Sequence, residues 1–228
     1  MAHVSDNASI REYQEFVREV YGLSNDRNFS TWDMISNVER FAMRALKGVR
    51  KNDNEKTKMN LIISFSWFTS LNNQLHVDIE KEVWERFPYL CSYCASCPCR
   101  CREKKIETRQ TITVENKTMP KTLREFQSMF QEIYPAGSRT VEQAGIHLAE
   151  ELGEFSEALM SYRGNHDDKN FRNVVVESAD VFSCFMSLFS SIGVSVAKEL
   201  SGMFSENCHA CKKAPCECSF DSVMKFES

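Results

Sequence analysis

The chain has 228 residues, of which 42% are hydrophobic and 26% charged, and its formal net charge is −4. These values are typical of a folded, soluble protein, and the acidic balance gives no reason to expect a surface that binds nucleic acid. Only 8 Gly and 5 Pro interrupt the sequence, which favours long helices.

The first residues, Met1 to Asp6, lack a basic segment followed by an apolar run, so no secretory signal is visible and we predict a cytoplasmic protein. Residues 181–197 carry no charge, but the run is short for a membrane span and follows two acids, Glu177 and Asp180. We therefore predict a buried helix and a turn at this point, and no membrane partner.

Helical spacing of apolar residues predicts four helices in each half of the chain. In chain order the expected ranges are 9–21, 31–48, 55–74 and 77–88, then 121–134, 139–162, 168–191 and 194–206. A polar, charged stretch at 104–120 is the expected linker between the halves.

The two halves also resemble each other in sequence. Residues 10–14 and 19–21 recur as 123–127 and 132–134, a shift of 113, and a Cys-x2-Cys-x4-Cys-x-Cys pattern recurs with a shift of 117. We predict a duplication, with a first copy at 1–103 and a second at 121–228.

Four antiparallel helices with short loops form a bundle, so the expected fold is all-α, with two tandem four-helix units. The third helix of each copy is apolar on nearly every side and needs to be covered all round. The third helix of the other copy is the simplest cover, which predicts a pseudo-twofold pair within one chain.

Acidic residues distinguish the second copy. Glu151 and Glu154 lie three residues apart on its second expected helix, and Glu177 and Asp180 have the same spacing on its third. Four carboxylates facing one volume suit a hard divalent cation such as Mg²⁺. An exposed acidic face also explains the first pair, and a structural ion pair is the alternative for the second, which sits among Val and Phe.

The first copy serves as an internal control. At the two shifts Val38 and Phe41 replace Glu151 and Glu154, and Asn60 and Ile63 replace Glu177 and Asp180. Ile, Val and Phe cannot ligate a cation, because they have no donor atom. One acidic site per chain is expected, built on the second copy.

Glu-Glu-x-x-Glu, then 22 residues, then Glu-x-x-Asp, on consecutive helices, resembles the MazG-like nucleoside triphosphate pyrophosphohydrolases, a group that includes dimeric dUTPases and phosphoribosyl-ATP pyrophosphohydrolases. The resemblance covers about residues 121–206. It implies Mg²⁺-dependent cleavage of a (deoxy)nucleoside triphosphate to a monophosphate and pyrophosphate. It implies Mg²⁺ ligands at Glu151, Glu154, Glu177 and Asp180, and a water-orienting, catalytic role for Glu150. Family sites usually lie between identical subunits, which leaves a homo-oligomer of this chain open.

Ten cysteines in a chain without a visible signal indicate metal sites rather than a disulfide framework. We expect two closed, structural zinc sites per chain, although spacing alone also fits an iron–sulfur cluster, and disulfides stay open. The two expected clusters are Cys91, Cys94, Cys99 and Cys101, and Cys208, Cys211, Cys216 and Cys218. Cys97 and His209 are expected to be bystanders, and Cys184 a small core residue.

Positive residues near the acids could hold phosphates, and Arg163, Lys169 and Arg172 are candidates, although ordinary surface charge also explains them. The leading hypothesis is an enzyme acting on a nucleotide. A zinc-containing interaction or nucleotide-sensing module without catalysis is the alternative. A nucleic-acid adaptor is not favoured, because basic residues flank only the first cysteine cluster.

Overall fold

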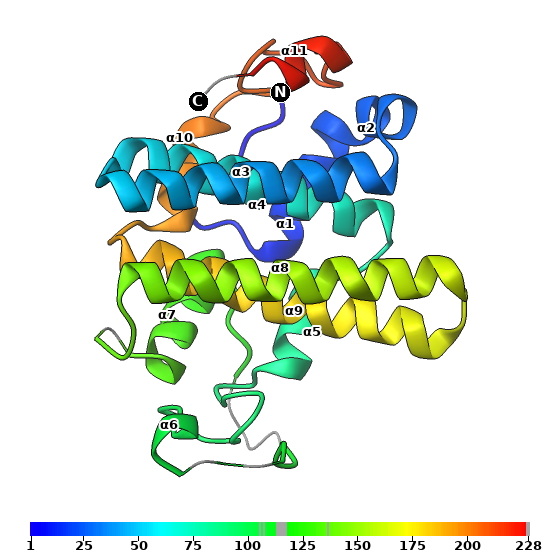
Figure 1. Cartoon of the computed structure of the whole chain (residues 1–228). Coiled ribbons are helices and arrows are strands. Elements are labelled where there is room, and N and C mark those ends of the chain that lie inside the picture. The colour runs from blue at the N-terminus through cyan, green and yellow to red at the C-terminus, as the bar shows by residue number, and fades with distance from the viewer. Residues whose placement is uncertain (105, 107, 113–117, 136, 227–228) are drawn as a thin grey trace. The chain divides into compact units, whose positions relative to one another are not determined.

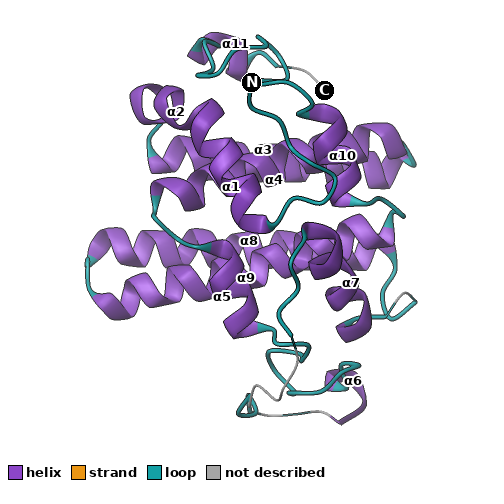
Figure 2. Ribbon diagram, turned by 180° about the vertical axis from the view of Figure 1, so that it is seen from behind, coloured by secondary structure: helices purple, strands orange, loops and turns teal. Residues whose placement is uncertain are grey.

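The computed structural model describes residues 1–104, 106, 108–112, 118–135 and 137–226. Within these ranges the chain is helical and contains no β-strand, which confirms the all-α prediction (Figure 2). The helices, labelled in Figure 1, are α1 (Ile10–Val17), the π-helical turn η1 (Arg18–Gly22), α2 (Leu23–Asn28), α3 (Thr31–Lys51), α4 (Asn54–Gln74), α5 (Ile79–Arg86), α6 (Cys101–Lys104), α7 (Leu123–Ile133), α8 (Val141–Gly164), α9 (Asp168–Ser191), α10 (Val196–Met203) and α11 (Phe220–Met224).

The long helices begin at residues that cap them. At α3 and α8 the hydroxyls of Ser30 and Thr140 accept a hydrogen bond from the third helical N–H. The side chain of that third residue, Asp33 or Gln143, in turn accepts a hydrogen bond from the backbone N–H of the capping residue. Asp167 caps α9 through the backbone N–H of Asn170. Each cap satisfies a donor that the first turn leaves without a helical partner, so the sequence fixes where these helices start.

The chain divides into two compact units, which we call unit 1 (Met1–Asp78 with Val194–Ser228) and unit 2 (Ile79–Gly193). These bounds differ from the predicted copies, since the fourth helix of each copy belongs to the unit that holds the first three helices of the other. Helix α5 therefore contacts α9 in unit 2, and α10 contacts α4 in unit 1. The linker predicted at 104–120 lies partly outside the described residues, and the pseudo-twofold pair stays a prediction.

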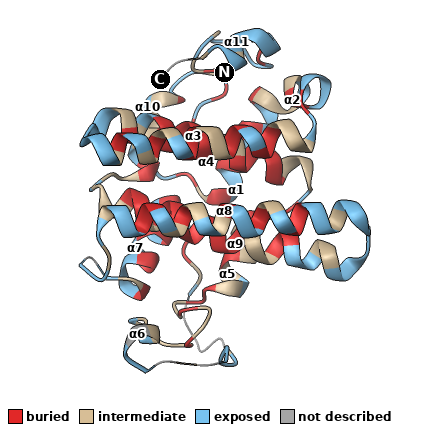
Figure 3. Cartoon of the chain, in the orientation of Figure 1, coloured by how far each residue is buried: buried red, intermediate tan, exposed pale blue. Residues whose placement is uncertain are grey.

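In unit 2, α8 packs along α9, and α5 and α7 both contact α9. Aromatic rings link these elements: the ring centroids of Phe87 and Phe130 are 5.2 Å apart, and Phe130 lies 6.2 Å from Phe182 on α9. The ends of α8 and α9 at their connecting turn are exposed, whereas the middle of α9 is buried (Figure 3). Carboxylates in the middle of α9 therefore lie in a largely apolar environment.

Among the described residues, α9 is also the one helix whose length and composition would suffice to cross a membrane. In its most apolar window 72% of the residues are buried within the structure. A core helix meets the same criterion, so this observation is weak evidence for a membrane span.

In unit 1, α3 packs along α4, and α1 and η1 contact α4 from another side. The rings of Tyr13 and Phe65 stack with centroids 5.7 Å apart, and Phe16 lies 5.3 Å from Phe204, next to α10. Gly48 permits the close approach of α3 and α4, because a Cβ there would lie 2.4 Å from Oγ1 of Thr57. Both units are thus a long helical hairpin with shorter helices packed on it.

Candidate functional site

Three carboxylates meet in the middle of unit 2. Glu151 extends from α8, and Glu177 and Asp180 extend from α9, with one oxygen of each within 4.8 Å of the others. Because helical residues three apart lie on one side, Glu177 and Asp180 both face α8. Three of the four predicted metal ligands therefore lie together. Oxygen donors of this kind and number can hold a divalent cation.

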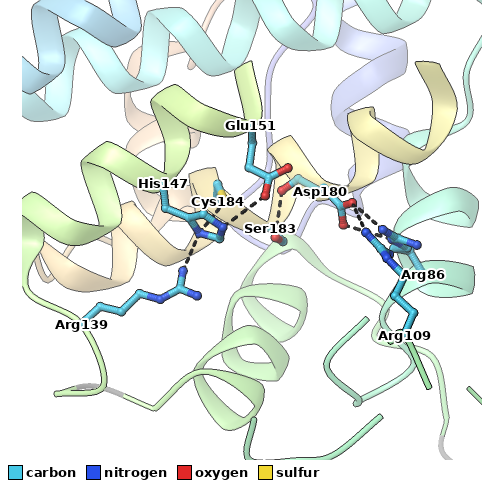
Figure 4. Close-up of polar contacts among 8 residues, drawn as sticks. All are labelled: Arg86, Arg109, Arg139, His147, Glu151, Asp180, Ser183 and Cys184. Carbon is cyan, nitrogen blue, oxygen red and sulfur yellow. Dashed lines mark hydrogen bonds and ion pairs between the residues drawn. The ribbon is translucent and has the colours of Figure 1, made fainter. Parts of the chain in front are cut away.

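The Asp180 side chain is already engaged in a buried ion pair (Figure 4). Arg86, the last residue of α5, donates from Nε at 3.0 Å and from Nη2 at 2.6 Å to its two oxygens, a bidentate arrangement. Nη2 of Arg109 lies 3.8 Å from the same carboxylate. Burial raises the pKa of Asp180 and the Arg86 charge opposes that shift, leaving the pKa above its ordinary value. The alternative of a structural ion pair thus applies to Asp180.

Glu177 lies beside this pair and is not satisfied by it. Its Oε2 is buried and has no hydrogen-bond partner among the described residues. Burial, followed by the charges of Asp180, Glu151 and Glu154, raises the pKa of Glu177 to about 7. A buried carboxylate oxygen without a partner costs free energy, and a cation would compensate that cost. The donor set therefore fits a metal ion.

Glu151 is held from its other side by a histidine (Figure 4). Nε2 of His147, one turn earlier on α8, lies 3.1 Å from Oε1 of Glu151, and its Nδ1 lies 2.5 Å from Nη1 of Arg139. The neutral tautomer with its proton on Nε2 satisfies both contacts, since Nδ1 then accepts from Arg139. Sγ of Cys184 also lies 3.2 Å from Nδ1, and His147, Glu151 and Cys184 form a second group with the spacing of metal ligands.

The other two predicted acids are exposed. Glu154 lies one turn beyond Glu151, outside the group of three. Its pKa is raised by burial and then by the charges of Glu151 and Asp180, which places it within electrostatic reach. Glu150 is also exposed and belongs to neither group. Both remain predictions as functional residues.

The positive candidates from the sequence lie elsewhere. Arg163, Lys169 and Arg172 are exposed near the turn between α8 and α9, and Nη1 of Arg172 pairs with Glu82 on α5 at 2.5 Å. The cations beside Asp180 are instead Arg86 and Arg109, and Arg139 contacts His147. The sequence contains no signal for Arg86 beyond its difference from Met203, the residue at the shift of 117.

The two cysteine clusters each bring four thiols together, so both can hold a metal ion. In cluster 1 the Sγ atoms of Cys91 and Cys101 are 3.7 Å apart, and those of Cys94 and Cys99 are 3.9 Å apart. In cluster 2 the corresponding distances are 3.9 Å for Cys208–Cys218 and 3.8 Å for Cys211–Cys216. A tetrahedral zinc site with bonds of about 2.3 Å places its sulfurs about 3.8 Å apart, whereas a disulfide needs about 2.05 Å.

Both clusters are built on the same backbone pattern. Cys91 accepts at its carbonyl from the N–H of Ala95, and Cys208 accepts in the same way from Lys212. The N–H of Cys99 donates to Ile133 in unit 2. The N–H of Cys216 donates to Val20 in unit 1. Each cluster is therefore attached to the end of the first helix of the other copy, the same exchange that the fourth helices make.

The predicted bystanders lie outside these clusters. Cys97 is not part of cluster 1, and His209 contacts Tyr21 rather than the thiols of cluster 2, with Nδ1 3.3 Å from the phenol oxygen. Cys184 is buried in α9, as expected of a core residue, but it also touches His147.

Comparisons with known proteins do not assign the chain. No protein-family model matches it, and neither the curated proteins nor the solved structures contain a significant match. The resemblance to the MazG-like enzymes therefore rests on the acidic motif alone, and function has to be inferred from the site itself.

Proposed function

We propose that the protein is a Mg²⁺-dependent nucleotide pyrophosphohydrolase that cleaves a (deoxy)nucleoside triphosphate to a monophosphate and pyrophosphate. The observation that carries this proposal is the buried Oε2 of Glu177, which lacks a hydrogen-bond partner next to Glu151 and Asp180. Three carboxylates with Arg86 and Arg109 beside Asp180 also supply both signs of charge that a metal-bound polyphosphate would contact.

Glu151, Glu177 and Asp180 would hold the metal, and Glu154, whose pKa the charges of Glu151 and Asp180 raise, is the fourth candidate ligand. Mg²⁺ bound there would neutralise phosphate charge and lower the pKa of a bound water. The orientation of Asp180 is defined because Arg86 donates a hydrogen bond to each of its two carboxylate oxygens. His147 does the same for Glu151, as outer partners do for ligands in known metal sites.

As a metal ligand Glu177 would be ionised, since carboxylates bind cations in that form, so other groups would handle the protons of the reaction. Arg109 is exposed and Arg139 is half-buried, so their remaining N–H groups would be free to donate to the oxygens of a bound phosphate. Glu150 keeps the water-orienting role that the family resemblance implies.

The remaining parts of the proposal concern the scaffold. We infer that the chain arose by duplication of a MazG-like four-helix unit, and that the first copy lost its acids. The cysteine clusters would bind two Zn²⁺ per chain with a structural role, because four thiolates leave no open position. An iron–sulfur cluster has the same donor set, and metal analysis distinguishes the two.

The test is a panel of ribo- and deoxynucleoside triphosphates with Mg²⁺, scored for pyrophosphate release. At least one nucleotide should be cleaved, and Glu177→Gln should keep the fold and abolish turnover. The matched control is Glu157→Gln, which removes an exposed acid from α8, the helix that carries Glu151. This variant should behave like the parent protein. Unchanged turnover in Glu177→Gln would show that the site is misplaced.

The alternative is a zinc-containing module that senses nucleotides without cleaving them. The bidentate Arg86–Asp180 pair favours it, since that pair satisfies Asp180 without any metal. In that case the same panel would show binding of a nucleotide with no pyrophosphate released, and the binding would not require Mg²⁺.

A further inference from the structure

Unit 1 contains a cavity of about 120 Å³ next to cysteine cluster 2. Its walls come from α2, α3, α4 and the C-terminal segment, and they include the aromatic side chains Phe29, Phe41, Trp67, Phe204 and Phe226. A cavity of about 150 Å³ lined by apolar residues holds one benzene molecule. The volume therefore suits a single six-membered ring rather than a fused pair.

The C-terminal segment forms one wall, and hydrogen bonds from α3 hold it in position. Arg40 on α3 donates to the carbonyl oxygens of Val223 at 3.2 Å and Met224 at 3.1 Å, and Arg44 donates to that of Phe226 at 3.0 Å. The Phe226 ring lies 6.3 Å from that of Phe41. These contacts therefore keep the C-terminal wall of the cavity in position in the folded unit.

Two polar side chains face this cavity without a partner. Asn25 and Ser70 are both only 6% exposed and both line the cavity. Among the described residues neither the amide of Asn25 nor the hydroxyl of Ser70 makes a hydrogen bond. Neither polar group is sealed from solvent, so both are open to a hydrogen-bonding ligand in the cavity. An amide offers a donor and an acceptor side by side, and a hydroxyl offers either.

Charge restricts the ligand further. No Asp, Glu, Lys or Arg side chain lines the cavity among the described residues, so a phosphate or carboxylate would find no counter-charge. The ligand is therefore neutral, flat and apolar on its faces, with hydrogen-bonding groups at its edge. We propose that this cavity binds a single-ring nitrogen heterocycle such as a pyrimidine base.

Cytosine and uracil, titrated into the full chain without added Mg²⁺, test the proposal by calorimetry or ligand-observed NMR. One of them should bind saturably at one site per chain. Asn25→Leu, which keeps the size but removes the amide, should weaken binding about tenfold, the loss of roughly 1.4 kcal/mol from hydrogen bonding. Ser70→Ala should weaken it severalfold.

Controls separate this cavity from the acidic site. Asn28→Leu changes an exposed asparagine of the same helix, and Glu177→Gln changes unit 2, so both should leave binding unchanged. Toluene, a ring without polar groups, should still bind to Asn25→Leu, which shows that the cavity persists in that variant. Because no phosphate or metal is present, the outcome is independent of the proposed enzyme activity.

Four outcomes would overturn the proposal. The first two are an absence of saturable binding by either pyrimidine, and binding that Asn25→Leu and Ser70→Ala leave intact. The third is adenine, a fused ring, binding as tightly as the single rings. The fourth is loss of binding in Glu177→Gln, which would show that the ring binds at the acidic site.

Discussion

Units 1 and 2 place opposite chemistry on the same helical hairpin. At positions related by the sequence shifts, Glu154, Asp180 and Cys184 in unit 2 correspond to Phe41, Ile63 and Trp67 in unit 1. The first set lies at or beside the acidic cluster, and the second lines the aromatic cavity. Replacing acids by aromatic and aliphatic residues at the same places thus converts a candidate cation site into an apolar pocket.

The comparison shows that the acids are not needed to build the hairpin. Unit 1 packs α3 along α4 with none of them, and its core is formed by stacked aromatic rings. Clustered carboxylates repel each other and resist burial, so a unit that only had to fold would gain stability by losing them. Their presence in unit 2 alone indicates a function that unit 1 does not share.

The largest effect should come from the part that both units have in common. Cys91→Ser removes one ligand of cluster 1, and Cys208→Ser removes one of cluster 2, so each variant should hold one metal ion per chain where the parent holds two. Structural zinc contributes about 10–16 kcal/mol in zinc-finger peptides, so both variants should be strongly destabilised. Elemental analysis and thermal unfolding measure the two effects.

The two variants should also differ from each other. Cluster 1 is attached to α7 of unit 2 and cluster 2 to η1 of unit 1. Cys91→Ser should therefore impair nucleotide cleavage, and Cys208→Ser should impair pyrimidine binding. If neither variant changes the metal content, the clusters are not metal sites.

The next effect tests the ion pair that unit 1 lacks. Arg86→Met installs the residue found at the matching position, Met203, and leaves Asp180 buried without its partner. Breaking a buried pair from one side costs about 3 kcal/mol, so the midpoint of chemical denaturation should fall. Adding Asp180→Ile, which copies Ile63, should recover most of that loss while turnover stays absent. If Arg86→Met alone is as stable as the parent protein, the buried Arg86–Asp180 pair does not contribute to stability.

The sequence predicted most of the scaffold and part of the site. The spacing of apolar residues placed the long helices within a few residues of their observed bounds. The exchange of α5 and α10 could not be predicted, because helical spacing shows which face is apolar but not which helix covers it. Arg86 was missed for this reason, since its role appears only once α5 is packed against α9.

A smaller effect concerns the histidine that orients Glu151. His147→Met copies Met34, the residue at the matching position of unit 1, and removes the contact to Oε1. Outer partners of metal ligands typically change metal affinity by about 10- to 100-fold, so the Mg²⁺ concentration needed for half-maximal turnover should rise within that range. His147→Gln, which keeps a donor, should recover part of the affinity. An unchanged Mg²⁺ requirement would place Glu151 outside the metal site.

The smallest effect is a dependence of stability on pH that comes from Glu177. Its pKa rises from the ordinary 4.5 to about 7 on folding, so between these values the folded chain binds more protons than the unfolded chain. In protein without added Mg²⁺, this group should therefore lower the free energy of unfolding as pH rises from 5 to 8. Glu177→Gln should remove that part of the slope and be the more stable protein at pH 8, whereas Glu157→Gln should retain it.

Mg²⁺ makes the same titration informative about the metal. A cation binds the ionised carboxylate, so its affinity should increase as pH rises through 7 and each ion bound should release part of a proton. Added Mg²⁺ should then flatten the pH dependence of unfolding in the parent protein and have no such effect in Glu177→Gln. An equal pH dependence in both proteins, with and without Mg²⁺, would mean that Glu177 is as well solvated as any surface acid. The difference in buried charge between the two units would then reduce to the Arg86–Asp180 pair.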